Sequence, residues 1–258
     1  MRARSADPAV GTDQETAGDP RRWRILGVIC TAYLMVGLDL TVMSLALPSA
    51  QDTLGFTDPD RQWIVTAYAL TFGSLLLFFG RVSDLVGRKE TFLIGLTGVA
   101  VASAVGGAAT SFGMLVAARA AQGAFAAMLA PACLALVATT FTDPQEKNKA
   151  FGIFSAVAAS GSGLGLLLGG TLIDALSWRW CMYVNLVFAA IAFLGGTRLL
   201  HRQTRKAARL DVLGVLLASG GMFCLVYGFS NAADDGWGTP LTWGFLVLGG
   251  ALLVLFAF

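Results

Sequence analysis

The chain has 258 residues, of which 56% are hydrophobic and only 13% are charged. A soluble domain usually carries roughly 25% charged residues, because water must solvate its surface, so this composition excludes an ordinary soluble domain. The net charge of +2 says little by itself, and the positions of the charges are more informative. Four cysteines all lie inside apolar runs without paired spacing, which indicates small hydrophobic residues and no disulfide or metal framework.

Residues 1–23 are polar and rich in Pro, Gly, Asp and Arg, which predicts a disordered cytoplasmic tail. Eight apolar segments follow, and each is long enough, or nearly so, to cross ~30 Å of hydrocarbon as a helix. A lipid-facing β-barrel needs short alternating segments, and these segments do not alternate. They cover residues 25–47, 63–79, 91–110, 113–141, 151–172, 180–200, 212–230 and 241–258.

This pattern predicts an all-α integral membrane fold. Six helices form one block over residues 24–200, a basic cytoplasmic loop covers 201–211, and two further helices cover 212–258. Lys and Arg gather in the tail and in the loops after the second, fourth and sixth segments, whereas the loops on the other side contain only Arg61 and Arg179. The positive-inside rule then predicts a cytoplasmic N-terminus in a multi-pass membrane protein. We expect this membrane to be the bacterial plasma membrane.

Two ionisable residues, Asp39 and Arg119, stand well inside apolar segments. The first helix starts on the cytoplasmic side at Ile25, which puts Asp39 ~21 Å outward at a rise of ~1.5 Å per residue. The fourth starts on the opposite side at Gly113, which puts Arg119 ~9 Å inward. In a ~30 Å core these depths coincide, so we expect the two side chains to pair.

Two interpretations of this pair remain open. Intramembrane charges are usually functional, so Asp39 and Arg119 are predicted to respond to protons or substrate at a cavity. The alternative is a fixed salt bridge that only joins two helices. Gln122, one turn from Arg119 on the same face, and its neighbour Gly123 either extend the polar lining of that cavity or serve helix packing alone.

The fifth segment carries glycines at four-residue spacing. Residues at i and i+4 share one face of a helix, so they predict a flat strip against which another backbone lies. This is strong evidence for helix packing and weak evidence for transport. The predicted interface glycines are Gly161, Gly165, Gly169 and Gly170.

The loop between the second and third segments reads GRVSDLVGRK over residues 80–89. Asp84 is able to accept hydrogen bonds from helix N-termini and basic side chains, and Gly87 permits a tight turn. The spacing resembles the cytoplasmic motif of the major facilitator superfamily. The resemblance implies a cytoplasmic gate formed by Gly80, Asp84, Gly87, Arg88 and Lys89.

Three further stretches resemble the fourteen-span drug:proton antiporter branch of that superfamily: residues 38–48, residues 119–123, and residues 178–180 followed by Asn185. The sequence departs from the branch at two places where the branch has proline: Leu166 follows Gly165, and Val187 stands two residues after Asn185. A fifth helix without a kinking proline is expected to be straighter.

The resemblance implies the N-terminal half of a proton-coupled exporter of hydrophobic or cationic small molecules, followed by a linker pair of helices. Asp39 and Arg119 would couple export to the proton gradient, with no cofactor, bound metal, enzymatic step or nucleic-acid partner. The expected partners are the substrate, the lipid bilayer, and a missing C-terminal half or second half-transporter, because such a pathway lies between two halves. The alternative is a truncated, non-transporting half that acts as a membrane scaffold or regulatory fragment.

Overall fold

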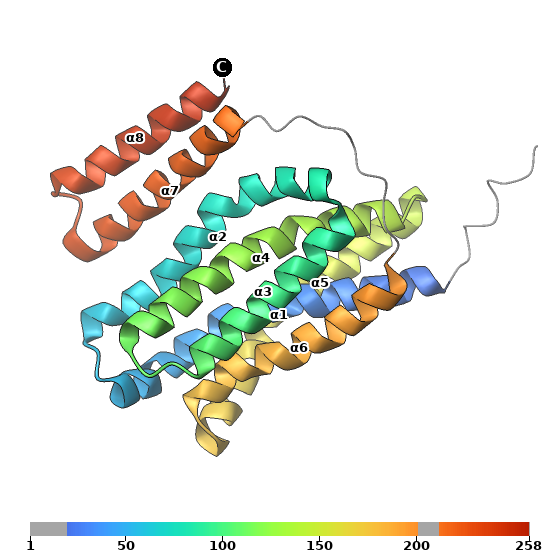
Figure 1. Ribbon diagram of the computed structural model, residues 1–258, viewed down its shortest axis with the longest axis horizontal. Coiled ribbons are helices and arrows are strands. Elements are labelled where there is room, and N and C mark those ends of the chain that lie inside the picture. Colours follow the sequence, from blue (N-terminus) through green and yellow to red (C-terminus); the bar gives the residue numbers. More distant parts are fainter. Residues whose placement is uncertain (1–19, 201–211, 258) are drawn as a thin grey trace, which may run out of the picture.

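The computed structural model describes residues 20–200 and 212–257, which form eight helices and contain no strand (Figure 1). This confirms the predicted all-α fold with six helices and a further pair. The helices are α1 (Arg21–Leu54), α2 (Asp58–Val86), α3 (Arg88–Gly107), α4 (Phe112–Thr140), α5 (Pro144–Ala175), α6 (Trp178–Leu199), α7 (Val212–Asp235) and α8 (Pro240–Ala257). Most of the predicted tail, and the predicted basic loop 201–211, lie outside the described residues.

The first six helices are long and apolar enough, by length and composition, to cross a membrane. The apolar parts of α7 and α8, Leu216–Ala232 and Pro240–Phe256, are shorter. Four helices, α1, α2, α5 and α7, extend several residues beyond the predicted segments, because an apolar run marks only the part that suits lipid. Polar caps continue the helix past it, as where Asp143 accepts a hydrogen bond from the Glu146 backbone N–H at the start of α5.

The first segment was predicted to end at residue 47, before Pro48, but α1 continues to Leu54. The helix ends where Gly55 takes a left-handed conformation, with φ of 71°, that glycine adopts without steric cost. The extra turns are held by packing, because Ala50 is fully buried. Proline is therefore accommodated inside this helix and does not terminate it.

The six-helix block is built from two similar groups of three helices. α1 packs on α5 and α6, and α4 packs on α2 and α3. If α1, α2 and α3 are exchanged for α4, α5 and α6, the α1–α5 contact becomes the α4–α2 contact. In the same way, the α1–α6 contact becomes the α4–α3 contact. The α1–α4 and α3–α6 contacts map onto themselves. This matches the three-plus-three internal repeats found within transporter halves.

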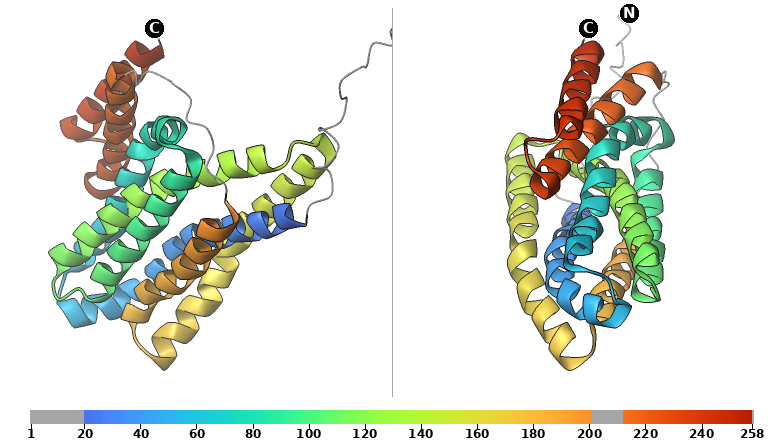
Figure 2. Two further views of the ribbon diagram at one scale, coloured as in Figure 1. Left: turned by 45° about the vertical axis from the view of Figure 1, so that its right-hand side comes forward. Right: turned by 90° about the vertical axis from the view of Figure 1, so that its left-hand side faces the viewer.

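The α7–α8 hairpin lies beside this block, with α7 against α2 (Figures 1 and 2). The Thr66 and Ser230 hydroxyls are 3.2 Å apart across this contact, and the rings of Trp63 and Tyr227 approach to 6.4 Å. Specific polar and aromatic contacts therefore join the pair to the block.

The buried apolar side chains form two clusters that meet along α1. One contains buried α1 residues between positions 25 and 36, and the other contains buried α1 residues between positions 38 and 50. Asp39 stands at the junction and is only 4% exposed. Apolar packing above and below therefore fixes the depth of this carboxylate within the bundle.

Candidate functional site

An ion pair joins α1 to α4 in the interior of the block. Arg119 Nη1 donates a hydrogen bond to Asp39 Oδ2 at 2.5 Å. Both side chains are almost wholly buried, with Arg119 only 1% exposed. The two residues that matched in predicted depth are thus in direct contact.

Neutral side chains complete the coordination of Asp39. Asn185 on α6 donates from Nδ2 to Asp39 Oδ1 at 2.6 Å, and Gln122 donates from Nε2 to the same oxygen at 3.2 Å. Gln122 also accepts from Arg119 at 2.8 Å and donates to the Ser103 hydroxyl at 2.7 Å. Four of the six helices of the block therefore contribute to one polar network.

Tyr68 on α2 covers the network from a fifth helix. The guanidinium carbon of Arg119 lies 4.5 Å from the centre of the Tyr68 ring, a cation–π geometry. Within the described part of the chain, three buried atoms of this cluster have no hydrogen-bond partner: Tyr68 Oη, Arg119 Nε and Asn185 Oδ1. Buried polar atoms are nearly always paired, so three unpaired atoms in one cluster indicate spare hydrogen-bonding capacity.

The sequence prediction missed Ser103, Asn185 and Tyr68 as members of this site. Depth is the one sequence signal that two of them share with the ion pair. Ser103 lies ~18 Å outward from the predicted start of its segment at residue 91, and Asn185 ~8 Å inward from the predicted start at residue 180. Both depths fall close to those of Asp39 and Arg119.

The predicted gate residues lie around the turn between α2 and α3. Gly87 has φ of 110°, a value that L side chains rarely adopt, and both helices meet at it. Arg88 and the half-exposed Asp84 form a 3.9 Å ion pair. Lys89 donates to the carbonyl oxygens of Thr197 and Leu200, which ties the start of α3 to the end of α6. Their gating role stays a prediction.

The glycine strip of α5 lies against α1. A Cβ added to Gly161 would be 3.2 Å from the Gly37 backbone, and one added to Gly165 would be 2.9 Å from Thr41 Cβ. Gly169 faces Val42 in the same way. Gly170 does not share this contact, because a Cβ there would meet nothing within 4 Å. Three of the four predicted glycines thus permit the close approach of the two helices.

We expect Gly165→Leu to push α5 away from α1 and to lower the free energy of unfolding by about 1–3 kcal/mol. Gly163 is the matched control on the same helix, since a Cβ there meets nothing within 4 Å. Gly163→Leu should leave stability unchanged or raise it slightly, because leucine is the better helix former. Denaturant unfolding of the two variants in one detergent makes the comparison, and equal stabilities would argue against a packing role for Gly165.

Gln122 and Gly123 were predicted as possible cavity lining. Gln122 is 1% exposed and belongs to the buried network. Gly123 marks a close approach of α4 to α2, where an added Cβ would overlap the carbonyl oxygen of Tyr68. The lining of the cavity described next includes neither of them.

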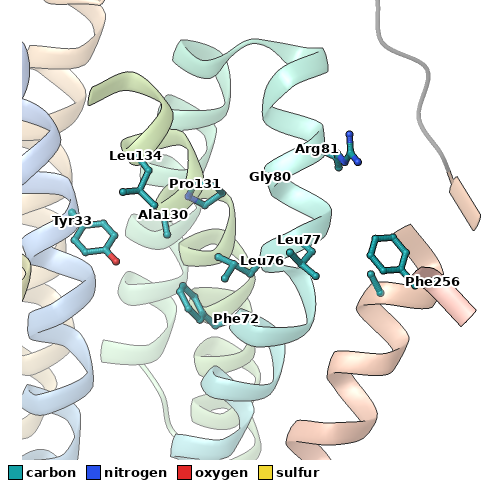
Figure 3. Close-up of a pocket in the computed structure, with 11 residues that line it drawn as sticks. Tyr33, Phe72, Leu76, Leu77, Gly80, Arg81, Ala130, Pro131, Leu134 and Phe256 are labelled. Atoms are coloured by element: carbon teal, nitrogen blue, oxygen red, sulfur yellow. The ribbon is translucent and has the colours of Figure 1, made fainter. Parts of the chain in front are cut away.

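A cavity of about 560 Å³ lies in the face formed by α1, α2 and α4, with α7 and α8 at its edge (Figure 3). Its size is within the range of small-molecule sites. Aromatic and aliphatic side chains dominate it, and Arg81 is its charged member. The lining residues are Tyr33, Phe72, Leu76, Leu77, Gly80, Arg81, Ala130, Pro131, Leu134, Ala218 and Phe256.

Comparison with known proteins places these features in context. The chain matches the Major Facilitator Superfamily over residues 29–258. It is 53% identical over 241 residues to the puromycin resistance protein of Streptomyces alboniger. The aligned region covers 93% of this chain and 48% of that protein. The cephamycin export protein of Amycolatopsis lactamdurans is 40% identical over 239 residues, covering 90% of this chain and 48% of that protein. The chain therefore spans about half the length of the curated relatives it matches.

Solved structures show the same arrangement of helices at low sequence identity. A bacterial homolog of the human lysosomal transporter Spinster, in an inward-facing and occupied conformation, gives a TM-score of 0.62 at 17% identity, covering 92% of this chain and 60% of that one. The human organic anion transporter MFSD10 gives a TM-score of 0.56 at 17% identity, covering 93% of this chain and 72% of that one. These similarities concern the fold alone.

Proposed function

Because the chain belongs to the major facilitator superfamily, we propose that it forms the N-terminal part of a proton-coupled exporter of small molecules. Export is supported by relatives named for antibiotic resistance or export, including the tetracenomycin C resistance and export protein of Streptomyces glaucescens, 36% identical over 228 residues. Proton coupling rests on the buried ion pair of Asp39 and Arg119. The chain is assigned transport across the membrane rather than catalysis.

The proposed coupling step is the protonation of Asp39. A proton from the aqueous phase converts the carboxylate to a neutral acid, and the buried Arg119 cation then loses its counter-charge. An unpaired charge in this environment is costly, so the helices that carry the two residues would rearrange. The proton gradient supplies the energy, and no cofactor is required.

The polar environment of Asp39 favours coupling over a fixed salt bridge. Of the two Asp39 carboxylate oxygens, only Oδ2 accepts a hydrogen bond from Arg119. The other oxygen, Oδ1, accepts from the neutral amide groups of Gln122 and Asn185. An inert structural pair gains most from a fully satisfied network. Here three atoms of the cluster are unpartnered among the described residues. That spare capacity suits a group that changes its protonation state.

The apolar cavity of Figure 3 would contribute to the substrate pathway. Phe72 and Tyr33 offer aromatic surface, and the eleven lining residues include no carboxylate. This composition favours neutral hydrophobic substrates. A cationic substrate would find its counter-charge in a second half of the transporter.

The second half completes the pathway in this proposal, either later in the same polypeptide or in a separate protein. The outer face of α5 offers it an apolar surface, since Leu164, Leu166 and Leu167 are 41%, 54% and 70% exposed. Asp84 at the end of α2 lies half exposed, so it would be accessible to a helix of that half. The N-terminus and the α2–α3 turn are assigned to the cytoplasm.

Extrusion by cells that express a complete transporter carrying this sequence tests the proposal. Wild-type extrusion should be abolished by an uncoupler, and Asp39→Asn and Arg119→Ala should reduce it to background. Asp52→Asn is the matched control, because Asp52 is an exposed carboxylate near the end of the same helix. Normal, uncoupler-sensitive extrusion by both Asp39→Asn and Arg119→Ala would overturn the coupling assignment.

A further inference from the structure

Asn185 donates a hydrogen bond to an Asp39 oxygen that would itself become a donor if it took up a proton. Its Nδ2 donates to Asp39 Oδ1 at 2.6 Å, which requires a lone pair on that oxygen. An ionised carboxylate only accepts, whereas a carboxylic acid also donates its proton. The carbonyl oxygen of Asn185 is buried and has no partner among the described residues. The side chain therefore holds an acceptor in reserve beside a group that would need one.

A carboxamide serves both states because it carries a donor and an acceptor on one carbon. Rotation of about 180° around its terminal torsion, which is a soft, roughly two-fold coordinate, exchanges Nδ2 and Oδ1. Asn185 Oδ1 would then accept the proton of a neutral Asp39. The unpartnered position passes from Oδ1 to Nδ2, so the number of unpaired amide atoms stays the same.

The arriving proton belongs on Asp39 Oδ1. Oδ2 accepts a hydrogen bond from the Arg119 guanidinium, so a proton there would also cost Asp39 that hydrogen bond. Oδ1 faces the amide of Asn185 at 2.6 Å and that of Gln122 at 3.2 Å. The proton comes from the aqueous phase, and no other bond changes.

Gln122 is not free to rotate as Asn185 is. Its Oε1 accepts from Arg119 and its Nε2 donates to Ser103, so rotation would break both bonds. Apart from its bond to Asp39, Asn185 would lose a 3.3 Å contact to the Ser103 hydroxyl, and that hydroxyl is able to donate to the rotated carbonyl instead. Of the two amides on Asp39, only Asn185 has an unused acceptor.

We propose that Asn185 is a two-state amide switch, donating to Asp39 when it is ionised and accepting from it when it is protonated. This positioning role rests on the proposed coupling function of Asp39. The charged and titratable groups near Asp39 are Arg119 from α4, Tyr68 from α2 and Cys181 from α6. From α3 comes the Ser103 hydroxyl, and α5 meets this part of α1 through glycines.

Infrared difference spectroscopy between high and low pH tests the switch on the 258-residue chain in lipid vesicles. The carbonyl band of the protonated acid is assigned to Asp39 by its loss in Asp39→Asn. Asn185→Leu removes the acceptor, so this band should move to higher wavenumber. Asn185→Thr supplies a hydroxyl that donates or accepts, and should return the band toward its wild-type position.

Asn231→Leu is the matched control. Asn231 is an amide on α7 that donates to Thr239 and Thr242 and takes no part in the Asp39 network, so its loss should leave the band in place. The same band position in wild type and Asn185→Leu would overturn the proposal, as would the absence of any titrating band that Asp39→Asn removes. If the band shifts as expected but extrusion survives Asp39→Asn, the result contradicts the coupling role of Asp39 and still supports the amide switch at Asn185.

Discussion

Replacing Arg119 by alanine should lower the free energy of unfolding by about 3–5 kcal/mol, because removal of one partner leaves a buried, uncompensated charge. Asp39 would keep the amide donors of Gln122 and Asn185 but lose its only charged partner among the described residues. The Tyr68 ring would lose the cation that it covers. Unfolding of the 258-residue chain in mixed micelles, followed by circular dichroism, measures the loss.

A double variant separates stability from function. Asp39→Leu with Arg119→Met removes both charges and replaces them by apolar side chains of similar length. Exchange of a buried ion pair for apolar groups is often neutral or stabilising, so unfolding should return close to wild type. Extrusion by the complete transporter should nevertheless stay at background. Restored extrusion would show that the pair is a structural salt bridge and nothing more.

The helical architecture follows from the sequence because lipid imposes a length on each apolar run. The ends of the helices do not follow from that rule. Beyond the apolar run they depend on caps, such as the Thr57 and Asp60 pair that begins α2, and on packing, as in α1 beyond Pro48. The predicted segments for α1, α2, α5 and α7 are therefore too short.

The candidate site was predictable only where charge made it conspicuous. Asp39 and Arg119 stand out because lipid disfavours both, and a common depth predicts their contact. Asn185 and Ser103 are neutral, and neutral polar residues often join membrane helices without further function. Depth alone does not reveal which side of a helix faces the pair. The structure reveals it through the packing of α3 and α6 against α1 and α4, which turns Ser103 and Asn185 toward the ion pair.

Spacing likewise gave only part of the glycine interface. The four-residue repeat indicates which glycines share a face, and Gly161, Gly165 and Gly169 do lie against α1. It does not locate isolated close approaches such as Gly123, which depend on the partner helix. The repeated three-helix arrangement was also not predicted, because it is a relation between contacts and leaves no obvious repeat in the sequence.

Gly123→Ala should destabilise the block more than Gly113→Ala, the corresponding change at the other glycine of α4. The added carbon would overlap the backbone carbonyl of Tyr68 and the Thr71 hydroxyl. A backbone cannot swing aside as a flexible side chain can, so α2 and α4 must separate. Thr71 donates to the Ala120 carbonyl at 2.8 Å across this contact, and that hydrogen bond would be strained. We expect a loss of about 1–3 kcal/mol.

The same separation would carry Tyr68 away from the Arg119 guanidinium, so Gly123→Ala should also impair extrusion. Gly113→Ala is the control on α4, since a Cβ at Gly113 meets nothing within 4 Å. It should leave unfolding and extrusion close to wild type. Micelle unfolding and cell extrusion of both variants decide the matter. If Gly123→Ala behaves like Gly113→Ala, the α2–α4 contact is not limiting, and Tyr68 is not positioned by it.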